Sequence, residues 1–153
     1  MTRSPPLPIP PGLQPLYRYW ESKRGDRRKP RRADIDPFEL VPMLASLMIV
    51  DVVPDARRYV YRLVGTREVD ARGSGPTGRP VGEAFIGSGR DRVLANYDRV
   101  VASAMPHIDS GTVITTRNKV DDSHVIFLPL SEDGETVSQI LVYTVFDPDT
   151  PVP

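Results

Sequence analysis

The chain has 153 residues, of which 39% are hydrophobic, enough for the core of one ordinary domain. It has no cysteine, which excludes disulfides, thiolate metal sites, cysteine nucleophiles and flavin adducts on cysteine. No stretch reaches the roughly 18 consecutive apolar residues of a membrane span, and none has the pattern of a signal peptide. We therefore expect a cytoplasmic protein without a membrane span.

The formal net charge is zero, but the charge is unevenly distributed along the chain. Residues 1–32 carry nine Lys or Arg and two acids, whereas the remainder carries eleven and eighteen. The densest basic run, residues 23–32, could bind the phosphates of a nucleic acid, or it could be a solvated linker or meet an acidic partner. It lacks interleaved aromatic residues, so we do not expect nucleic acid as the main partner.

The N-terminal part of the chain divides into two segments. Residues 1–12 are rich in proline and are expected to be disordered. Residues 13–32 are predicted to form a short amphipathic helix followed by a basic linker. Four apolar side chains share one face of that helix: Leu13, Leu16, Tyr17 and Trp20. This face could dock on the chain's own sheet or on a second copy, and we take it as a candidate homodimer interface.

A short helix and a β-hairpin are predicted next. Asp36-Pro37 is a strong helix start, with Glu39 placed for a capping box. Strands are expected at residues 47–53 and 59–65, joined by a turn at residues 54–57. If Asp51 faces Arg62 in this hairpin, one polar pair lies in an apolar ladder, although two solvated charges are an equal alternative.

The middle of the chain is rich in glycine and is followed by a long helix. The letters of Gly73-Ser74-Gly75-Pro76-Thr77-Gly78 match a dinucleotide-binding loop, but no strand–loop–helix context surrounds them, so we interpret them as an ordinary loop. The apolar stripe along residues 93–104 predicts an amphipathic helix that Met105-Pro106 ends.

Three strands are predicted at the end, at residues 111–120, 125–130 and 137–146. Hairpin turns are expected at residues 121–123 and 131–134, and Pro129 should lie at a strand end or bulge. The order of elements predicts an α+β fold: a five-stranded antiparallel sheet with helices on one face, preceded by the N-terminal amphipathic helix.

Several ordered segments give the chain a more specific resemblance. They are Tyr19-Trp20, residues 24–27, residues 33–37, residues 61–66, residues 77–79 and residues 128–134. With these segments the chain resembles the PAS-domain superfamily, and in particular short bacterial stand-alone PAS-like proteins. Lys29 departs from the apolar residue expected before Pro30. The resemblance implies a PAS-like domain over residues 33–147 with a tail at 148–153, and a sensory role in signal transduction.

The resemblance also implies where a ligand or partner would bind, namely on the sheet face under the long helix. The candidate ligand-binding residues there are Tyr97, Val101, Thr115, Arg117 and Tyr143. For each of them an ordinary alternative exists: core packing for the tyrosines and solvation for Arg117.

The two histidines, His107 and His124, are candidates for haem ligands or for a metal site with nearby acids such as Asp109, Asp121 or Asp122. Neither has the short ligand spacing of a metal motif, so no metal is assigned and any cofactor is unknown. No nucleophile motif such as GxSxG occurs.

Together these observations predict a non-enzymatic regulatory module that homodimerises and binds a protein partner, with a small molecule as a further candidate ligand. Two alternatives stay open. The first is nucleic-acid binding through residues 23–32, and the second is a small enzyme built around a buried carboxylate.

Overall fold

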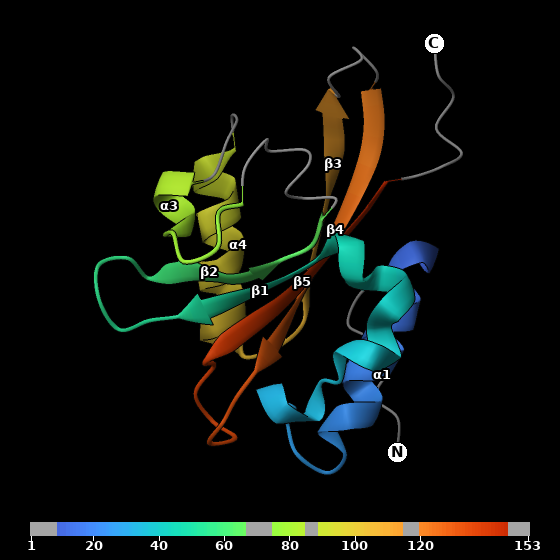
Figure 1. The fold of residues 1–153 in the computed structure, drawn as a ribbon, viewed down its shortest axis with the longest axis vertical. Coiled ribbons are helices and arrows are strands. Elements are labelled where there is room, and N and C mark those ends of the chain that lie inside the picture. The colour runs from blue at the N-terminus through green and yellow to red at the C-terminus, as the bar shows by residue number, and fades with distance from the viewer. Residues whose placement is uncertain (1–8, 67–74, 85–88, 115–119, 147–153) are drawn as a thin grey trace.

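The computed structural model describes residues 9–66, 75–84, 89–114 and 120–146 (Figure 1). Its centre is a five-stranded antiparallel sheet with the strand order β2-β1-β5-β4-β3. The strands are β1 (Leu47–Val52), β2 (Tyr59–Val64), β3 (His107–Ile114), β4 (Val120–Leu130) and β5 (Gln139–Phe146). The sheet and the N-terminal helix confirm the predicted α+β fold.

The helical segments lie on the two faces of this sheet. They are η1 (Pro11–Leu13), α1 (Gln14–Arg24), η2 (Arg32–Asp34), η3 (Pro37–Ser46), α3 (Val81–Ala84) and α4 (Arg90–Ser103). Figure 1 shows α3 and α4 on one side of the strands, and α1 with η3 on the other. The described part of the chain is thus three layers deep, and its N-terminal helix supplies the third layer.

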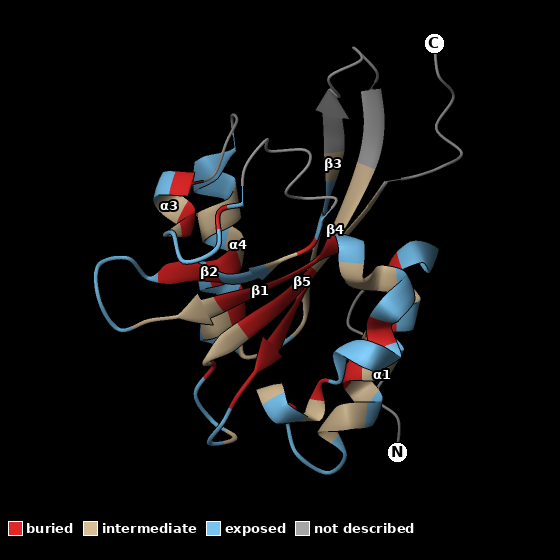
Figure 2. Cartoon of the chain, viewed as in Figure 1, coloured by how far each residue is buried: buried red, intermediate tan, exposed pale blue. Residues whose placement is uncertain are grey.

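Strand alternation explains why both faces need a cover. In β1, Met48 and Val50 belong to the core under α4, whereas Leu47 and Ile49 belong to the core under α1. Successive side chains of a strand point to opposite faces, so four apolar residues in a row supply two separate cores. The buried residues accordingly run along the middle of the sheet (Figure 2).

The β1–β2 hairpin differs from the predicted register. Ile49 pairs with Leu63 and Val50 with Tyr61, so Arg62 is an extra residue on β2 and the register shifts at this point. This bulge leaves Arg62 exposed, and Asp51 pairs with Val60 instead. The predicted pairing of Asp51 with Arg62 is therefore wrong. The Asp51 carboxylate instead accepts a hydrogen bond from Gln139 Nε2 at 2.7 Å.

The β3–β4 hairpin begins earlier than predicted. β3 starts at His107, directly after Pro106, and β4 already includes Asp121 and Asp122. The turn predicted at residues 121–123 is therefore wrong, because these polar residues pair with residues 111–113 across the ladder. Consecutive charged residues favour a turn, but pairing between the two backbones places them within the strand.

Pro129 lies one residue before the end of β4, as predicted for a strand proline. β3 begins opposite Phe127, so β4 has no neighbour on that side at Pro129. The missing N–H of proline therefore costs no ladder hydrogen bond there.

Segment η3 follows the predicted start and has the predicted N-cap, Asp36, but Glu39 contacts α1 instead of completing a capping box. Asp36 accepts a hydrogen bond from the Phe38 N–H at 3.0 Å, and the segment is a 3₁₀ helix that contains Pro42. Glu39 binds Lys23 and the Tyr19 hydroxyl of α1, at 2.9 and 3.0 Å. These contacts join η3 to α1 on the sheet face that both of them cover.

Candidate functional site

The region under α4 is filled by aromatic side chains. Tyr97 is 1% exposed, and its ring lies 5.0 Å from that of Tyr59 and 5.4 Å from that of Phe127, edge to face in the second case. Val101, which is partly buried, packs against the same cluster. The structure thus brings together Tyr97 and Val101, two of the five predicted ligand-binding residues, and packs them into the core.

Of the other three predicted residues, the structure describes only Tyr143, and it does not join this cluster. Tyr143 packs with the core under α1, because its neighbour Val142 takes the α4 side of strand β5. The prediction that Tyr143 faces α4 is therefore wrong, because successive side chains of a strand point to opposite faces of the sheet. Thr115 and Arg117 lie outside the described residues.

A polar pair lies at the rim of the aromatic cluster. The Tyr59 hydroxyl donates to the carboxylate of Asp98, which also forms an ion pair with Arg58. Burial, together with the Asp98 carboxylate, raises the pKa of Tyr59 to about 12. The hydroxyl therefore stays protonated and ties β2 to α4.

A second polar network joins α4 to the start of β3. The Asp109 carboxylate accepts hydrogen bonds from Arg92 and, at 2.8 Å, from the Asn96 amide nitrogen. The Asn96 oxygen is therefore free to accept from His107 Nε2, 3.0 Å away. This assigns the ring proton of neutral His107 to Nε2. The ring also stacks on Phe127, with a centroid distance of 5.8 Å.

Neither histidine lies in a recognisable metal site within the described residues. His107 belongs to the network above, and burial followed by the charge of Arg99 lowers its pKa. His124 Nδ1 lies 2.7 Å from the Ser110 hydroxyl on the neighbouring strand. No group of three His, Cys, Asp or Glu that could hold a metal occurs in the part of the chain that the structure describes.

The predicted dimer face of α1 docks on the chain's own sheet. Leu13 and Leu16 are fully buried and Trp20 is 3% exposed, all within the core that also holds Leu128 and Leu141. The Trp20 indole N–H donates to the Pro129 carbonyl at 2.9 Å. The sequence left open whether this face docks on the chain's own sheet or on a second copy, and in the structure it docks on the sheet. These three side chains therefore have no free surface for a second copy. Tyr17 is partly buried against the same core.

The glycine-rich loop is described only in part. Gly73 and Ser74 lie outside the described residues, and Gly78 donates its N–H to the Tyr61 carbonyl at 2.7 Å. Gly78 has a φ of 86°, which glycine adopts without strain. This end of the loop therefore runs along the edge strand β2.

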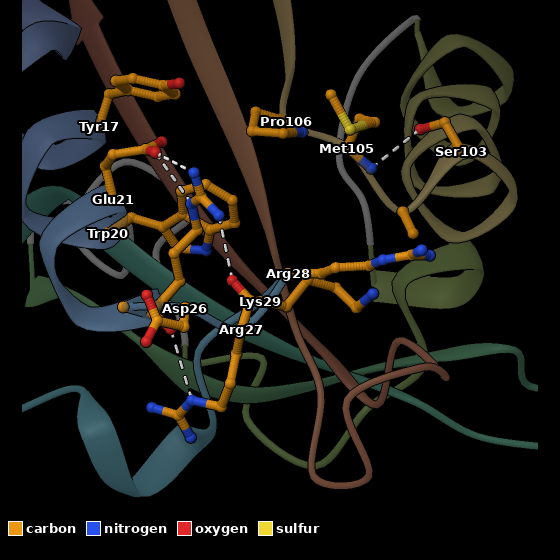
Figure 3. Close-up of a pocket in the computed structure, with 13 residues that line it drawn as sticks. Tyr17, Trp20, Glu21, Asp26, Arg27, Arg28, Lys29, Ser103, Met105 and Pro106 are labelled. Atoms are coloured by element: carbon orange, nitrogen blue, oxygen red, sulfur yellow. Dashed lines mark hydrogen bonds and ion pairs between the residues drawn. The ribbon is translucent and has the colours of Figure 1, made fainter. Parts of the chain in front are cut away.

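A cavity of about 520 Å³ opens between α1, the basic loop that follows it and the segment after α4 (Figure 3). Its lining combines apolar and cationic side chains: Tyr17, Trp20, Glu21, Arg24, Gly25, Asp26, Arg27, Arg28, Lys29, Ser103, Ala104, Met105 and Pro106. We call this the loop cavity. Ligand sites usually have volumes of roughly 300–1,000 Å³, so its size suits a small molecule.

The loop cavity was not predicted from the sequence. The sequence shows the charge of the basic run and a lysine at position 29 in place of an apolar residue, but the helix end that completes the cavity lies about 80 residues further along the chain. The one signal in the sequence for this cavity is Lys29, which stands where PAS-like proteins are expected to have an apolar residue.

The comparisons with known proteins agree with this architecture. A family model described as a PAS domain matches residues 10–144, almost the whole described chain. The chain belongs to the PAS domain family. A comparison with curated proteins gave no match.

Solved PAS structures share the fold at low sequence identity. The PAS domain of Bordetella pertussis BvgS is 14% identical with a TM-score of 0.57, over 74% of this chain and 87% of that one. A sensory box histidine kinase from Vibrio cholerae is 20% identical with a TM-score of 0.50, over 72% and 85%. A variant of RsLOV is 11% identical with a TM-score of 0.51, over 71% of this chain and 63% of that one. At these identities the likeness shows the PAS fold alone.

Proposed function

We propose that this PAS domain is a non-catalytic sensory or regulatory module that acts by associating with another protein chain, in the first place a second copy of itself. Membership of the PAS family supports a sensory role. None of the described helices is long and apolar enough to cross a membrane. The observation that carries the association is an apolar patch on η3.

The η3 patch consists of Phe38 and Val41, which are 86% and 59% exposed. Large apolar side chains that gather on a surface mark contact sites more often than single exposed ones do. A second copy is the first candidate partner, because residues 1–32 carry a surplus of seven positive charges and the remainder a surplus of seven negative ones. Opposite charges on two copies can attract one another over a distance, while the apolar patch supplies the contact.

Light scattering of the double variant Phe38→Ser, Val41→Ser tests this surface. We expect the wild type to have the mass of a dimer and the variant that of a folded monomer, because neither residue supports the core. The control is Leu63→Ser, which removes a side chain that is 39% exposed on β2 and should leave the dimer intact. A monomeric wild type would overturn self-association, and a dimeric double variant would overturn the η3 surface.

The contacts of residues 23–32 bear on the nucleic-acid alternative. Lys23, Arg24 and Arg27 form ion pairs with Glu39, Glu21 and Asp34, respectively. Much of the basic run is thus neutralised within the chain, which weakens the attraction to phosphates. Binding to RNA or DNA that falls steeply with salt, and that is lost when Arg28, Arg31 and Arg32 become Ala, would restore this alternative.

The alternative of a small enzyme with a buried carboxylate gains no support from the described residues. The buried polar residues are Lys29, Ser46 and Ser131, and none of them is an acid. In the loop cavity, Glu21 is paired with Arg24 and Asp26 is exposed.

A further inference from the structure

Lys29 is the starting point, because its side chain is almost wholly buried while its ammonium group has no partner among the described residues. The residue is 2% exposed and lines the loop cavity. Its ammonium group has no hydrogen bond or ion pair to any of the described residues. Its nitrogen is not among the fully buried unpartnered atoms of the described residues, so it reaches the loop cavity, where a bound anion can meet its charge.

The other charges of the loop cavity do not compensate Lys29. Its lining has four cationic side chains and two acidic ones, a surplus of two positive charges. Arg24 is paired with Glu21, and Arg27 with Asp34 outside the lining. Arg28 and Lys29 remain without an ion-pair partner among the described residues. Both extend from the loop toward the segment that follows α4 (Figure 3).

The rest of the wall is apolar and well anchored. Trp20 is fixed by its hydrogen bond to the Pro129 carbonyl, and its ring centroid lies 6.1 Å from that of Tyr17. Met105, which is 42% exposed, and Pro106 form the opposite side. The loop cavity thus offers cations on one side and apolar surface on two others.

We propose that the loop cavity binds a small organic anion, with a carboxylate or phosphate head group at Lys29 and Arg28 and an apolar body between Trp20 and Met105. Both head groups carry the negative charge and the acceptor oxygens that a lysine and an arginine bind. Because the wall comes from the α1 segment and from the end of α4, the anion joins the layers on the two faces of the sheet. The site does not depend on the η3 patch.

Fluorescence of Trp20, the chain's one tryptophan, gives a direct assay. We expect octanoate and octyl phosphate to change its emission with saturation, while the uncharged 1-octanol of similar shape binds about tenfold more weakly or worse, because it leaves Lys29 unpaired. A difference between the two anions identifies the preferred head group.

Two variants test the cationic side, with a third as control. Lys29→Met and Arg28→Glu should each weaken anion binding by about tenfold or more, whereas Arg62→Gln, an exposed arginine outside the cavity, should bind like the wild type. Lys29→Met should also melt at about the same temperature or higher, because methionine keeps most of the apolar stem and no ion pair of the described residues is lost. Arg28 is exposed, so Arg28→Glu tests the site even where Lys29→Met fails to fold.

Three results would each overturn the proposal. They are the absence of saturable binding of either anion at millimolar concentration, equal binding of 1-octanol, and unchanged binding by both cavity variants. Each leaves the proposed association through η3 standing, since that is measured as mass without any added ligand.

Discussion

His107 shows how a single side chain depends on its surroundings. Burial lowers its pKa, the charge of Arg99 lowers it further, and Asp109 acts in the opposite direction. Burial alone would raise the pKa of Asp109, but its hydrogen bonds with Arg92 and Asn96 outweigh that effect and the pKa lies below the usual value. The folded protein therefore holds a neutral imidazole beside an ionised carboxylate.

A pH dependence of stability follows from this arrangement. Unfolded histidine takes up a proton near pH 6.5, whereas folded His107 resists it until a lower pH, so the free energy of unfolding should fall as the pH drops from about 6.5 to the folded pKa. Asp109 titrates below this window. Urea unfolding of the wild type and of His107→Gln between about pH 7.5 and 5.5 measures how much His107 contributes to the pH dependence of stability, because glutamine does not take up a proton.

Arg99→Gln is the matched variant for the histidine. Removing the neighbouring charge should raise the folded pKa of His107 and reduce the loss of stability at low pH. A stability difference between the wild type and His107→Gln that stays constant over the whole pH range would contradict the interpretation.

At the scale of elements, α1 is part of the fold and not an appendage. It covers the sheet face formed by residues such as Ile49, Leu128 and Leu141, all of which are buried. Because β1, β4 and β5 carry apolar side chains on both faces, the sheet would expose a hydrophobic surface without this helix. The amphipathic pattern of α1 fits this intramolecular role.

Substitutions on the two sides of α1 test that role. Leu16→Ala removes a fully buried side chain and should lower the free energy of unfolding by about 2–5 kcal/mol. Arg18→Ala, on the exposed side of the same helix, should change it by no more than about 0.5 kcal/mol. Denaturant unfolding gives both values, and a neutral effect of Leu16→Ala would mean that the helix does not dock on the sheet in solution.

At the scale of the whole molecule, the question is where the folding unit begins. The sequence divides the chain at residue 33, with the helix and basic linker before it and the PAS-like domain after it. The family model begins at residue 10, and the core under α1 draws on both parts. The boundary at residue 33 therefore remains a prediction that a truncation can test.

A chain that begins at Ala33 lacks Leu13, Leu16 and Trp20. We expect it to lose cooperative thermal unfolding and to bind the dye ANS, because one face of its sheet is uncovered. A chain that begins at Ile9 retains the helix and should unfold like the full chain. Cooperative unfolding of the shorter chain near the full-length midpoint would show that residues 33–147 fold alone.

The sequence by itself determined the architecture, because that depends on local patterns. The helical spacing of Leu13, Leu16 and Trp20, the start at Asp36 and the apolar strands each carry their own signal, and together they predicted the α+β fold and the PAS resemblance. Tyr97 could likewise be placed on the inner face of its helix.

The tertiary structure decided what depends on contacts between distant segments. The bulge at Arg62 and the start of β3 at His107 follow from pairing between strands, which local propensity does not encode. The docking of α1 on its own sheet follows from the second apolar face of the strands. The loop cavity exists only because Lys29 and Met105 are brought together across the fold, so its unpaired cation could be seen only in the folded protein.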